Sequence, residues 1–258
     1  MFKKNIFQRK LRQFHRWFGF LIGIQFLFWT IGGIYFSWSD MDEVHGDHQK
    51  SHIHPMGTQL SLQSPQPIID KIKEKDTVNF IFEVKLIQIL GKPFYQIVYS
   101  KDHDRNKKVR LADASTGELR GALSKEEAIL VAKKGFISDA KVAEVLYLTQ
   151  TDSHHEYREQ PLPAYAISFE HPSRTTVYVA SELGTIQKFR NKPWRVFDFL
   201  WMLHTMDFES RDNISNGILR AFSILGLLTI LSGFVLFFMT MNKKANKAKQ
   251  NLKGVNKN

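Results

Sequence analysis

The stretch FGFLIGIQFLFWTIGGIYFSW, Phe18–Trp38, decides the fold, because it runs for 21 residues without a charged side chain. A helix rises about 1.5 Å per residue, so this run would measure roughly 30 Å, the thickness of the hydrocarbon core of a bilayer. Basic residues precede it and acidic residues follow it: Lys3, Lys4, Arg9, Lys10, Arg12 and Arg16, then Asp40, Asp42 and Glu43. This polarity predicts a transmembrane helix over residues 18–38, with the N-terminus in the cytoplasm.

A cleaved secretory signal is the alternative interpretation of this start. The apolar core of a signal is usually about 7–15 residues long and ends at small residues. This run is longer and ends in Tyr35, Phe36 and Trp38, which suit a membrane interface better than a cleavage site. The pattern therefore favours a retained anchor.

A second apolar run, Ile218–Met241, predicts a second transmembrane helix over residues 217–241. Its one charge, Arg220, lies near the outer end, where a long side chain can reach the interface. Small residues on both runs would allow close helix packing: Gly19, Gly23, Gly226, Ser232 and Gly233. Two spans make a hairpin with everything between them on the outer side.

The charge distribution supports this topology. The chain has 258 residues and a net charge of +11, but residues 1–16 and 242–258 each hold six Lys and Arg and no acid. The remaining chain holds 24 basic and 25 acidic residues, so the excess lies in two tails, 1–17 and 242–258. Both tails flank apolar runs, which predicts that both ends are cytoplasmic and argues against nucleic acid as a partner. The absence of cysteine excludes disulfides and thiolate sites.

The linker at residues 39–62 is polar and rich in histidine. Four histidines, His45, His48, His52 and His54, are interleaved with acidic residues. Imidazole and carboxylate groups together could bind Zn, Cu or Ni. A flexible segment loses much entropy on closing around an ion, so a solvated linker is the alternative.

The segment 63–192 predicts an α+β fold. A helical pattern at Gln66–Lys75 precedes strand patterns at Asn79–Leu90, Pro93–Ser100 and Lys107–Asp113. Ser124–Lys134 opens with a capping box and precedes strand patterns at Lys141–Thr149, Ala164–Glu170 and Thr175–Ser181. The offsets between Tyr95 and Tyr165 and between Gly117 and Gly184 are 70 and 67 residues. This predicts two tandem modules, 63–122 and 123–192, each a helix on a small antiparallel sheet.

An amphipathic helix is expected at residues 194–209, just before the second span. One face would carry apolar and aromatic side chains at steps of three and four: Phe197, Leu200, Trp201, His204 and Phe208. Such a helix beside a membrane span is expected to lie in the outer interface.

Four short patterns together resemble the PepSY-associated transmembrane family. They are Phe14-His15-Arg16-Trp17-x-Gly19 at the first span, Asp113-x-x-Thr116-Gly117 at a turn, Trp194–His204, and Leu231-Ser232-Gly233-Phe234 in the second span. The resemblance covers most of the chain in order. It implies tandem PepSY-like modules outside the inner membrane and a role accessory to uptake of iron or another metal.

Larger members of that family, with four or more spans, include ferric and siderophore-iron reductases that hold haem b through histidines. Carried over to this chain, the resemblance makes His15 and His204 the candidate axial ligands. This chain has two spans rather than four, and a bilayer would separate the two histidines. A homodimer or larger membrane complex would therefore have to pair like residues around each haem.

The sequence offers little support for an enzyme. His154-His155-Glu156 lies in an expected solvent-facing loop, and there is no HExxH, GxSxG or phosphate-binding glycine loop. The primary hypothesis is a non-enzymatic inner-membrane protein that presents an extracytoplasmic binding or regulatory module. The alternative is a membrane haem-dependent reductase component that uses His15 and His204.

Overall fold

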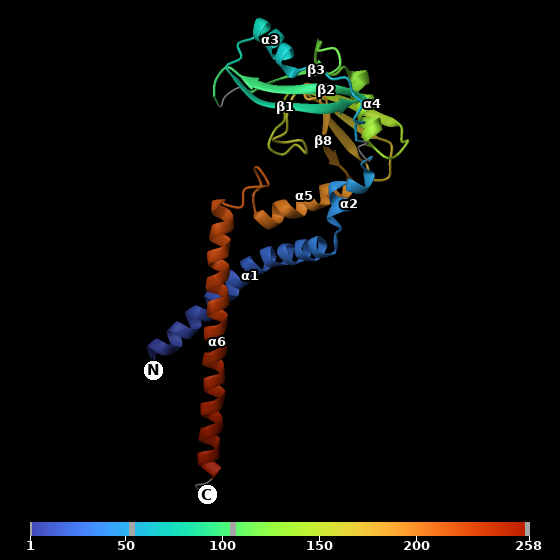
Figure 1. Cartoon of the computed structure of the whole chain (residues 1–258). Helices are drawn as coiled ribbons and strands as arrows, with labels where there is room; N and C mark the ends of the chain where they lie inside the picture. The colour runs from blue at the N-terminus through green and yellow to red at the C-terminus, as the bar shows by residue number, and fades with distance from the viewer. Residues whose placement is uncertain (1, 52–54, 104–106, 256–258) are drawn as a thin grey trace. The chain divides into compact units, whose positions relative to one another are not determined.

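The computed structural model describes residues 2–51, 55–103 and 107–255, and the chain divides into two compact units. One unit combines Met1–Trp38 with Asp198–Asn258, and the other is Ser39–Phe197. The first is helical and the second contains two antiparallel sheets, so the α+β prediction is confirmed (Figure 1).

The helical unit contains two helices that are long and apolar enough to cross a membrane. Helix α1 runs from Phe2 to Trp38, and helix α6 runs from Gly217 to Val255. Their candidate spans are Ile6–Trp38 and Gly217–Met241. The two helices pack against each other, and most side chains of both spans are exposed. Exposed apolar helices of this length are consistent with a two-span membrane protein.

The first sheet of the other unit is a four-stranded meander that carries helix α3, Pro65–Lys75. Its strands, in spatial order, are β1 (Phe80–Ile89), β2 (Lys92–Ser100), β3 (Lys108–Asp113) and β4 (Leu119–Arg120). Ser64 caps α3, which buries Ile68 and Ile72 against Tyr95, Ile97 and Tyr99 of β2. Successive residues of a strand point to opposite faces, so these odd-numbered residues of β2 define the face under α3.

The second sheet repeats this order of elements. Helix α4, Lys125–Gly135, precedes β5 (Val142–Leu148), β6 (Ala164–Phe169), β7 (Thr176–Ala180) and β8 (Thr185–Arg190), again a meander. Ser124 and Glu127 form the capping box that the sequence predicts. Ala128 and Ala132 of α4 are fully buried, and these small side chains bring the helix close to β6 and β7.

The two sheets share one hydrophobic core. Apolar side chains of the first sheet lie in the same cluster as those of α4 and the second sheet: Ile87, Ile89, Phe94 and Leu111 with Ala128, Ala132, Ile167, Phe169, Val177, Val179 and Phe189. Gln96 of β2 also donates a hydrogen bond to the Leu183 carbonyl at 2.7 Å, in the turn before β8. The first sheet is therefore covered by α3 on one face and by the second sheet and α4 on the other.

The first part of the predicted linker, residues 40–50, forms two short helical turns where the sequence predicts an irregular segment. Helix α2, Met41–His45, is capped by Asp40 and ends at Gly46, and a 3-10 turn follows at Asp47–Gln49. Val44 is buried, and the buried Gln49 side chain accepts a 2.6 Å hydrogen bond from the Thr175 hydroxyl. Long-range contacts of this kind leave no trace in local hydrophobic periodicity.

Candidate functional site

His15 lies on α1, where its ring faces helix α6. Its Nδ1 is 2.8 Å from the Ser232 hydroxyl and 3.2 Å from the Thr229 carbonyl. The Ser232 hydroxyl also lies 2.7 Å from the Thr229 carbonyl, so the three groups form one hydrogen-bonded cluster. Gly233 makes room for the ring, because a Cβ there would lie 3.1 Å from the imidazole Cε1. His15 thus joins the two candidate spans.

His204 lies near the end of helix α5, Lys192–Thr205, among aromatic rings. The ring centroids of Trp29, Trp201 and Phe36 are 5.8, 5.9 and 6.0 Å from its own. Trp29 also donates its indole N–H to the His204 carbonyl at 2.9 Å. The His204 Nδ1 is buried and has no hydrogen-bond partner among the described residues. Trp201 and His204 of the predicted apolar face therefore pack on the first span. The helix ends at Thr205 rather than at residue 209, and Phe208, which lies beyond it, is 50% exposed.

The two histidines of one chain do not form a common haem site. His204 packs against Trp29 and Phe36, which follow His15 by 14 and 21 residues in the same helix. At about 1.5 Å per residue, at least roughly 20 Å of helix separates the two rings. Within residues 2–51, 55–103 and 107–255, no three His, Asp or Glu side chains gather as a metal-binding group. Haem binding by these residues remains a prediction that requires a second copy of the chain.

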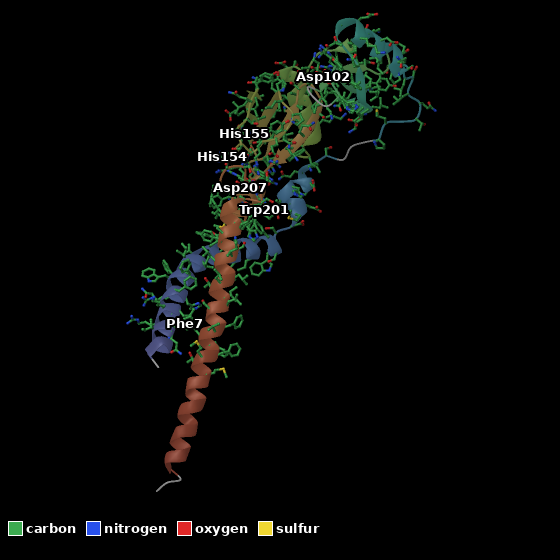
Figure 2. All side chains as sticks on the ribbon, turned by 90° about the vertical axis from the view of Figure 1, so that its left-hand side faces the viewer. Phe7, Asp102, His154, His155, Trp201 and Asp207 are labelled. Atoms are coloured by element: carbon green, nitrogen blue, oxygen red, sulfur yellow. The ribbon has the colours of Figure 1, made fainter. Side chains whose placement is uncertain are left out.

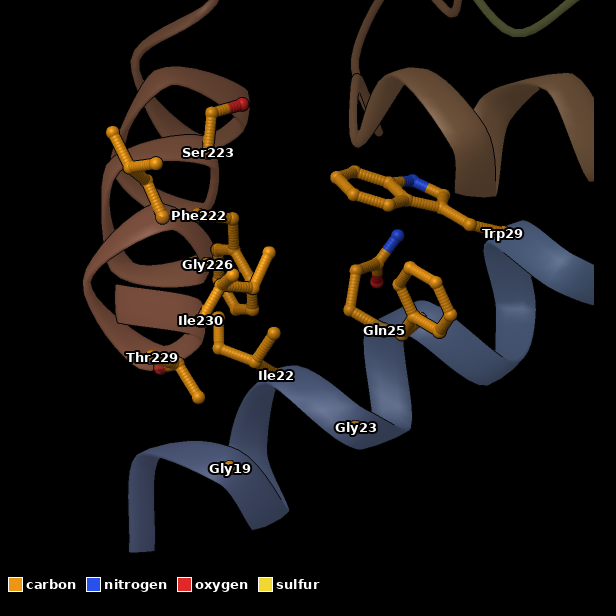
Figure 3. A pocket seen from close by; sticks show the side chains of 12 residues that line it. Gly19, Ile22, Gly23, Gln25, Trp29, Phe222, Ser223, Gly226, Thr229 and Ile230 are labelled. Atoms are coloured by element: carbon orange, nitrogen blue, oxygen red, sulfur yellow. The ribbon is translucent and has the colours of Figure 1, made fainter. Parts of the chain in front are cut away.

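An apolar pocket of about 560 Å³ lies between α1 and α6 (Figure 3). Gly19 and Gly23 line it from α1 and Gly226 from α6, so three of the five small residues singled out in the sequence face this pocket. Gln25 and Trp29 point from α1 toward α5, where Gln25 donates to the Leu203 carbonyl at 2.8 Å. Neither His15 nor His204 lines this pocket.

The histidines of the segment after the first span are only partly described. His45 and His48 are exposed, and His52 and His54 lie outside the described residues. Metal binding by this cluster stays a prediction.

A larger cleft of about 670 Å³ lies in the unit Ser39–Phe197, between the edges of the two sheets. One wall is Lys85–Gln88 and Leu90, from β1 and the turn after it. The opposite wall comes from Gly184–Ile186 at the start of β8 and from Val131, Lys134 and Gly135 of α4. Ser51, Pro55 and Met56 also line the cleft. We call it the sheet-edge cleft. It has no signature in the sequence, because residues about 100 positions apart form it.

A basic extension continues this cleft. A neighbouring pocket of about 490 Å³ shares Ser51, Gly135 and Ile186 with it and is lined further by His45, Lys50, Lys188 and Arg190. Burial, with the nearby charges of Arg190 and Lys50, lowers the pKa of Lys188. The described residues that line the two pockets include five Lys and Arg side chains and no Asp or Glu. The lining is therefore basic, and Lys85 and Lys134 of the cleft have no ion pair with a described residue.

Glu156 is part of a structural network that the sequence does not reveal. The sequence predicts a solvent-facing loop at His154–Glu156, and His154 is indeed exposed (Figure 2). Glu156, however, accepts two hydrogen bonds from the Arg195 guanidinium, at 2.6 and 2.8 Å, and one from the Tyr178 hydroxyl at 2.6 Å. Burial, together with the Glu156 charge, raises the pKa of Tyr178. These groups fix the loop to β7 and to the start of α5.

A buried carboxylate organises the loop after α5. Asp207 accepts hydrogen bonds from the Ser210 hydroxyl and from the backbone N–H groups of Glu209, Ser210 and Asn213. Burial opposes its ionisation, but these donors prevail and lower the pKa of Asp207 from 3.8 to about 2. Asp207 therefore stabilises the connection between α5 and α6 as a fixed anion.

Comparison with known proteins yields no relative for this chain: no family model, no curated protein and no solved structure matches it.

Proposed function

We propose that this chain is an inner-membrane protein with two spans that holds a binding module on the extracytoplasmic side and serves uptake of iron or another metal as an accessory factor. In this proposal the unit Ser39–Phe197 is a tandem PepSY-like domain, and both basic tails are cytoplasmic. The sheet-edge cleft carries the proposal, because a 670 Å³ concave surface with apolar walls and few polar groups is typical of a binding site.

The charge pattern supports the orientation. Basic residues at 1–16 and 242–258 flank the candidate spans, while the body between them is nearly neutral. The positive-inside rule relates such flanks to the cytoplasm. The order of elements supports the tandem assignment, since a helix followed by a four-stranded meander occurs twice.

Reporter fusions test the orientation. An enzyme reporter that is active only outside the cytoplasm, inserted near residue 150, should be active, and the same reporter after Asn258 should be silent. Activity of a cytoplasm-only reporter near residue 150 would refute the proposal. The uptake role predicts that cells lacking the chain accumulate less metal under limitation. A version without residues 39–197 should fail to restore accumulation, while the full chain should restore it.

The redox alternative is a haem b component in a homodimer. One observation favours it: the Nδ1 atom of His15 lies within hydrogen-bond distance of Ser232 and Thr229, and such contacts orient histidines that bind iron through the other nitrogen. A purified protein with a reduced-minus-oxidised haem spectrum that disappears in His15→Ala or His204→Ala would support this alternative. A colourless protein, expressed with ample haem supply, would reject it.

A further inference from the structure

We infer that the sheet-edge cleft binds an extended polypeptide segment with apolar and acidic side chains, which adds a strand to the free edge of β1. This inference rests on the proposed function, because it names the ligand class of the extracytoplasmic module. It depends on three properties of the cleft: an open strand edge, apolar walls and an unbalanced positive charge.

The cleft runs along the backbone edge of β1. Strand β1 is the outermost strand of its sheet, pairing with β2 on one side, and no described strand pairs with its other side. Successive residues of a strand point to opposite faces, yet four consecutive residues, Lys85–Gln88, line the cleft. A pocket reached from both faces must follow the edge between them, where unpaired N–H and C=O groups lie. The far wall contains Gly184 and the first residues of β8, Thr185 and Ile186, and β8 is also an outermost strand.

The apolar side chains near this edge continue beyond the cleft. Within it, Leu86, Ile87, Leu90, Val131 and Ile186 supply apolar surface. Farther along β1, Phe80, Ile81, Phe82 and Val84 are each 38 to 40% exposed. An exposed apolar edge strand promotes uncontrolled pairing and is normally blunted by charge, proline or a covering segment. Here Glu83 and Lys85 are the charged residues of β1, and the apolar side chains around them offer a surface on which a partner strand can pack.

The charges select the ligand. Lys85 and Lys134 are the charged residues among those described in the cleft, and neither has an ion pair with a described residue. Lys50, Lys188 and Arg190 follow in the basic extension, where Lys50 pairs with Asp47. An acidic segment would neutralise this surface, whereas a basic one would be repelled. At about 3.3 Å per residue, the stretch Lys85–Leu90 accommodates roughly six residues of an extended peptide.

Peptide binding to the full chain in mild detergent tests the inference. The probe is a fluorescein-labelled peptide of alternating valine and glutamate, about eight residues long, and binding is read by fluorescence anisotropy. We expect saturable binding to the wild-type protein, and affinity lower by about tenfold in Lys85→Glu and in Lys134→Glu. Lys75→Glu on α3 is the matched control, because it makes the same charge change on the helix that covers the other face of the sheet. It should leave binding unchanged.

Three further probes separate strand addition from simpler attraction. The same peptide with N-methyl groups on its backbone should bind at least tenfold more weakly, since it loses donors for the edge of β1. Equal binding of the methylated peptide would overturn strand addition. Oligoglutamate that competes as well as the probe would show that charge alone is recognised, and would also overturn the inference. A peptide of alternating valine and lysine that binds as tightly as the probe would show that Lys85 and Lys134 of the cleft do not select an acidic ligand.

The outcome is independent of the topology experiment. If the probe does not bind while the reporter near residue 150 is extracytoplasmic, the ligand class is wrong and the membrane-anchored module stands. If the reporter is cytoplasmic, the proposed function fails whether or not the peptide binds.

Discussion

Replacement of Gly184 by alanine tests whether the two sheets share one core. Gly184 has a φ of +72° and lies in the turn before β8. A Cβ at this position would lie 2.5 Å from Ile89 Cδ1 and 3.1 Å from Leu111 Cδ1. Both contacts are to side chains of the first sheet that are only 2% exposed, so neither can move into solvent.

Gly117 provides a matched control in the corresponding turn of the first sheet. Its φ is +70°, but a Cβ there would be 3.5 Å from the nearest atom, Ile68 Cγ1, an ordinary contact. Both substitutions incur the left-handed backbone cost of about 1–2 kcal/mol. Gly184→Ala adds overpacking, which typically costs about 1–3 kcal/mol.

The difference between the two variants isolates the contact between sheets. A domain of this size loses about 2–4 °C in Tm per kcal/mol, so Gly184→Ala should melt roughly 6 °C below Gly117→Ala. Thermal unfolding of the full chain in detergent, followed by loss of the β-sheet circular dichroism signal, measures both. Equal melting temperatures would refute the reasoning, because the extra cost arises only if Ile89 and Leu111 are held against the turn.

Three other predictions concern local features. Ser124→Ala removes the cap of α4 and should cost about 1 kcal/mol in the free energy of unfolding, whereas Ser124→Asp should cost less, as chemical denaturation will show. The native pKa of Asp207 lies below its ordinary value, so its carboxylate stabilises the fold fully above about pH 4, and that stability is lost as the pH falls toward 2. Asp207→Asn should therefore unfold more readily at pH 7 and lose less further stability on acidification; a parallel acid profile would contradict this. The chain has no cysteine, so introduced pairs can be tested for disulfide formation without interference. G19C with T229C should form a disulfide across the contact of α1 with α6, whereas G33C with T229C should not. Adding Gly233→Leu to the first pair should reduce the fraction of chains that form this disulfide, because the leucine displaces His15.

Local sequence patterns predict the elements of this fold well. The capping box at Ser124 and Glu127 correctly predicts the start of α4, which begins at Lys125, directly after the cap residue Ser124. The helix expected at Gln66–Lys75 is α3, Pro65–Lys75. These signals are local because caps and apolar periodicity act within one or two turns. The expected strands also lie within a few residues of β1, β2, β3, β5, β6 and β7.

The candidate site could not be predicted in the same way. The sheet-edge cleft joins β1 to α4 and β8, and Glu156 meets Arg195 across 39 positions. Contacts between residues this far apart in the sequence depend on how the sheets pack, and local residue spacing does not predict that packing. Sequence analysis identifies histidines as candidate ligands because residue type alone indicates their chemistry. An open strand edge, in contrast, depends on the order of strands in the sheet, which the sequence does not state.

Asn191 holds together the two ends of the unit Ser39–Phe197. Asn191 is 1% exposed, and its Nδ2 donates a hydrogen bond to the Glu43 carbonyl at 2.8 Å. Its Oδ1 accepts a hydrogen bond from the Trp194 N–H at 2.8 Å, so Asn191 is the N-cap of α5. One side chain thus joins the segment that enters the unit Ser39–Phe197 to the helix that leaves it, directly after Arg190 of the basic extension. Asn191→Ala should increase amide hydrogen exchange in residues 40–50 and 192–197 while peptide affinity at the cleft stays unchanged. Unchanged exchange in both segments would mean that backbone packing, rather than Asn191, holds the two connections together.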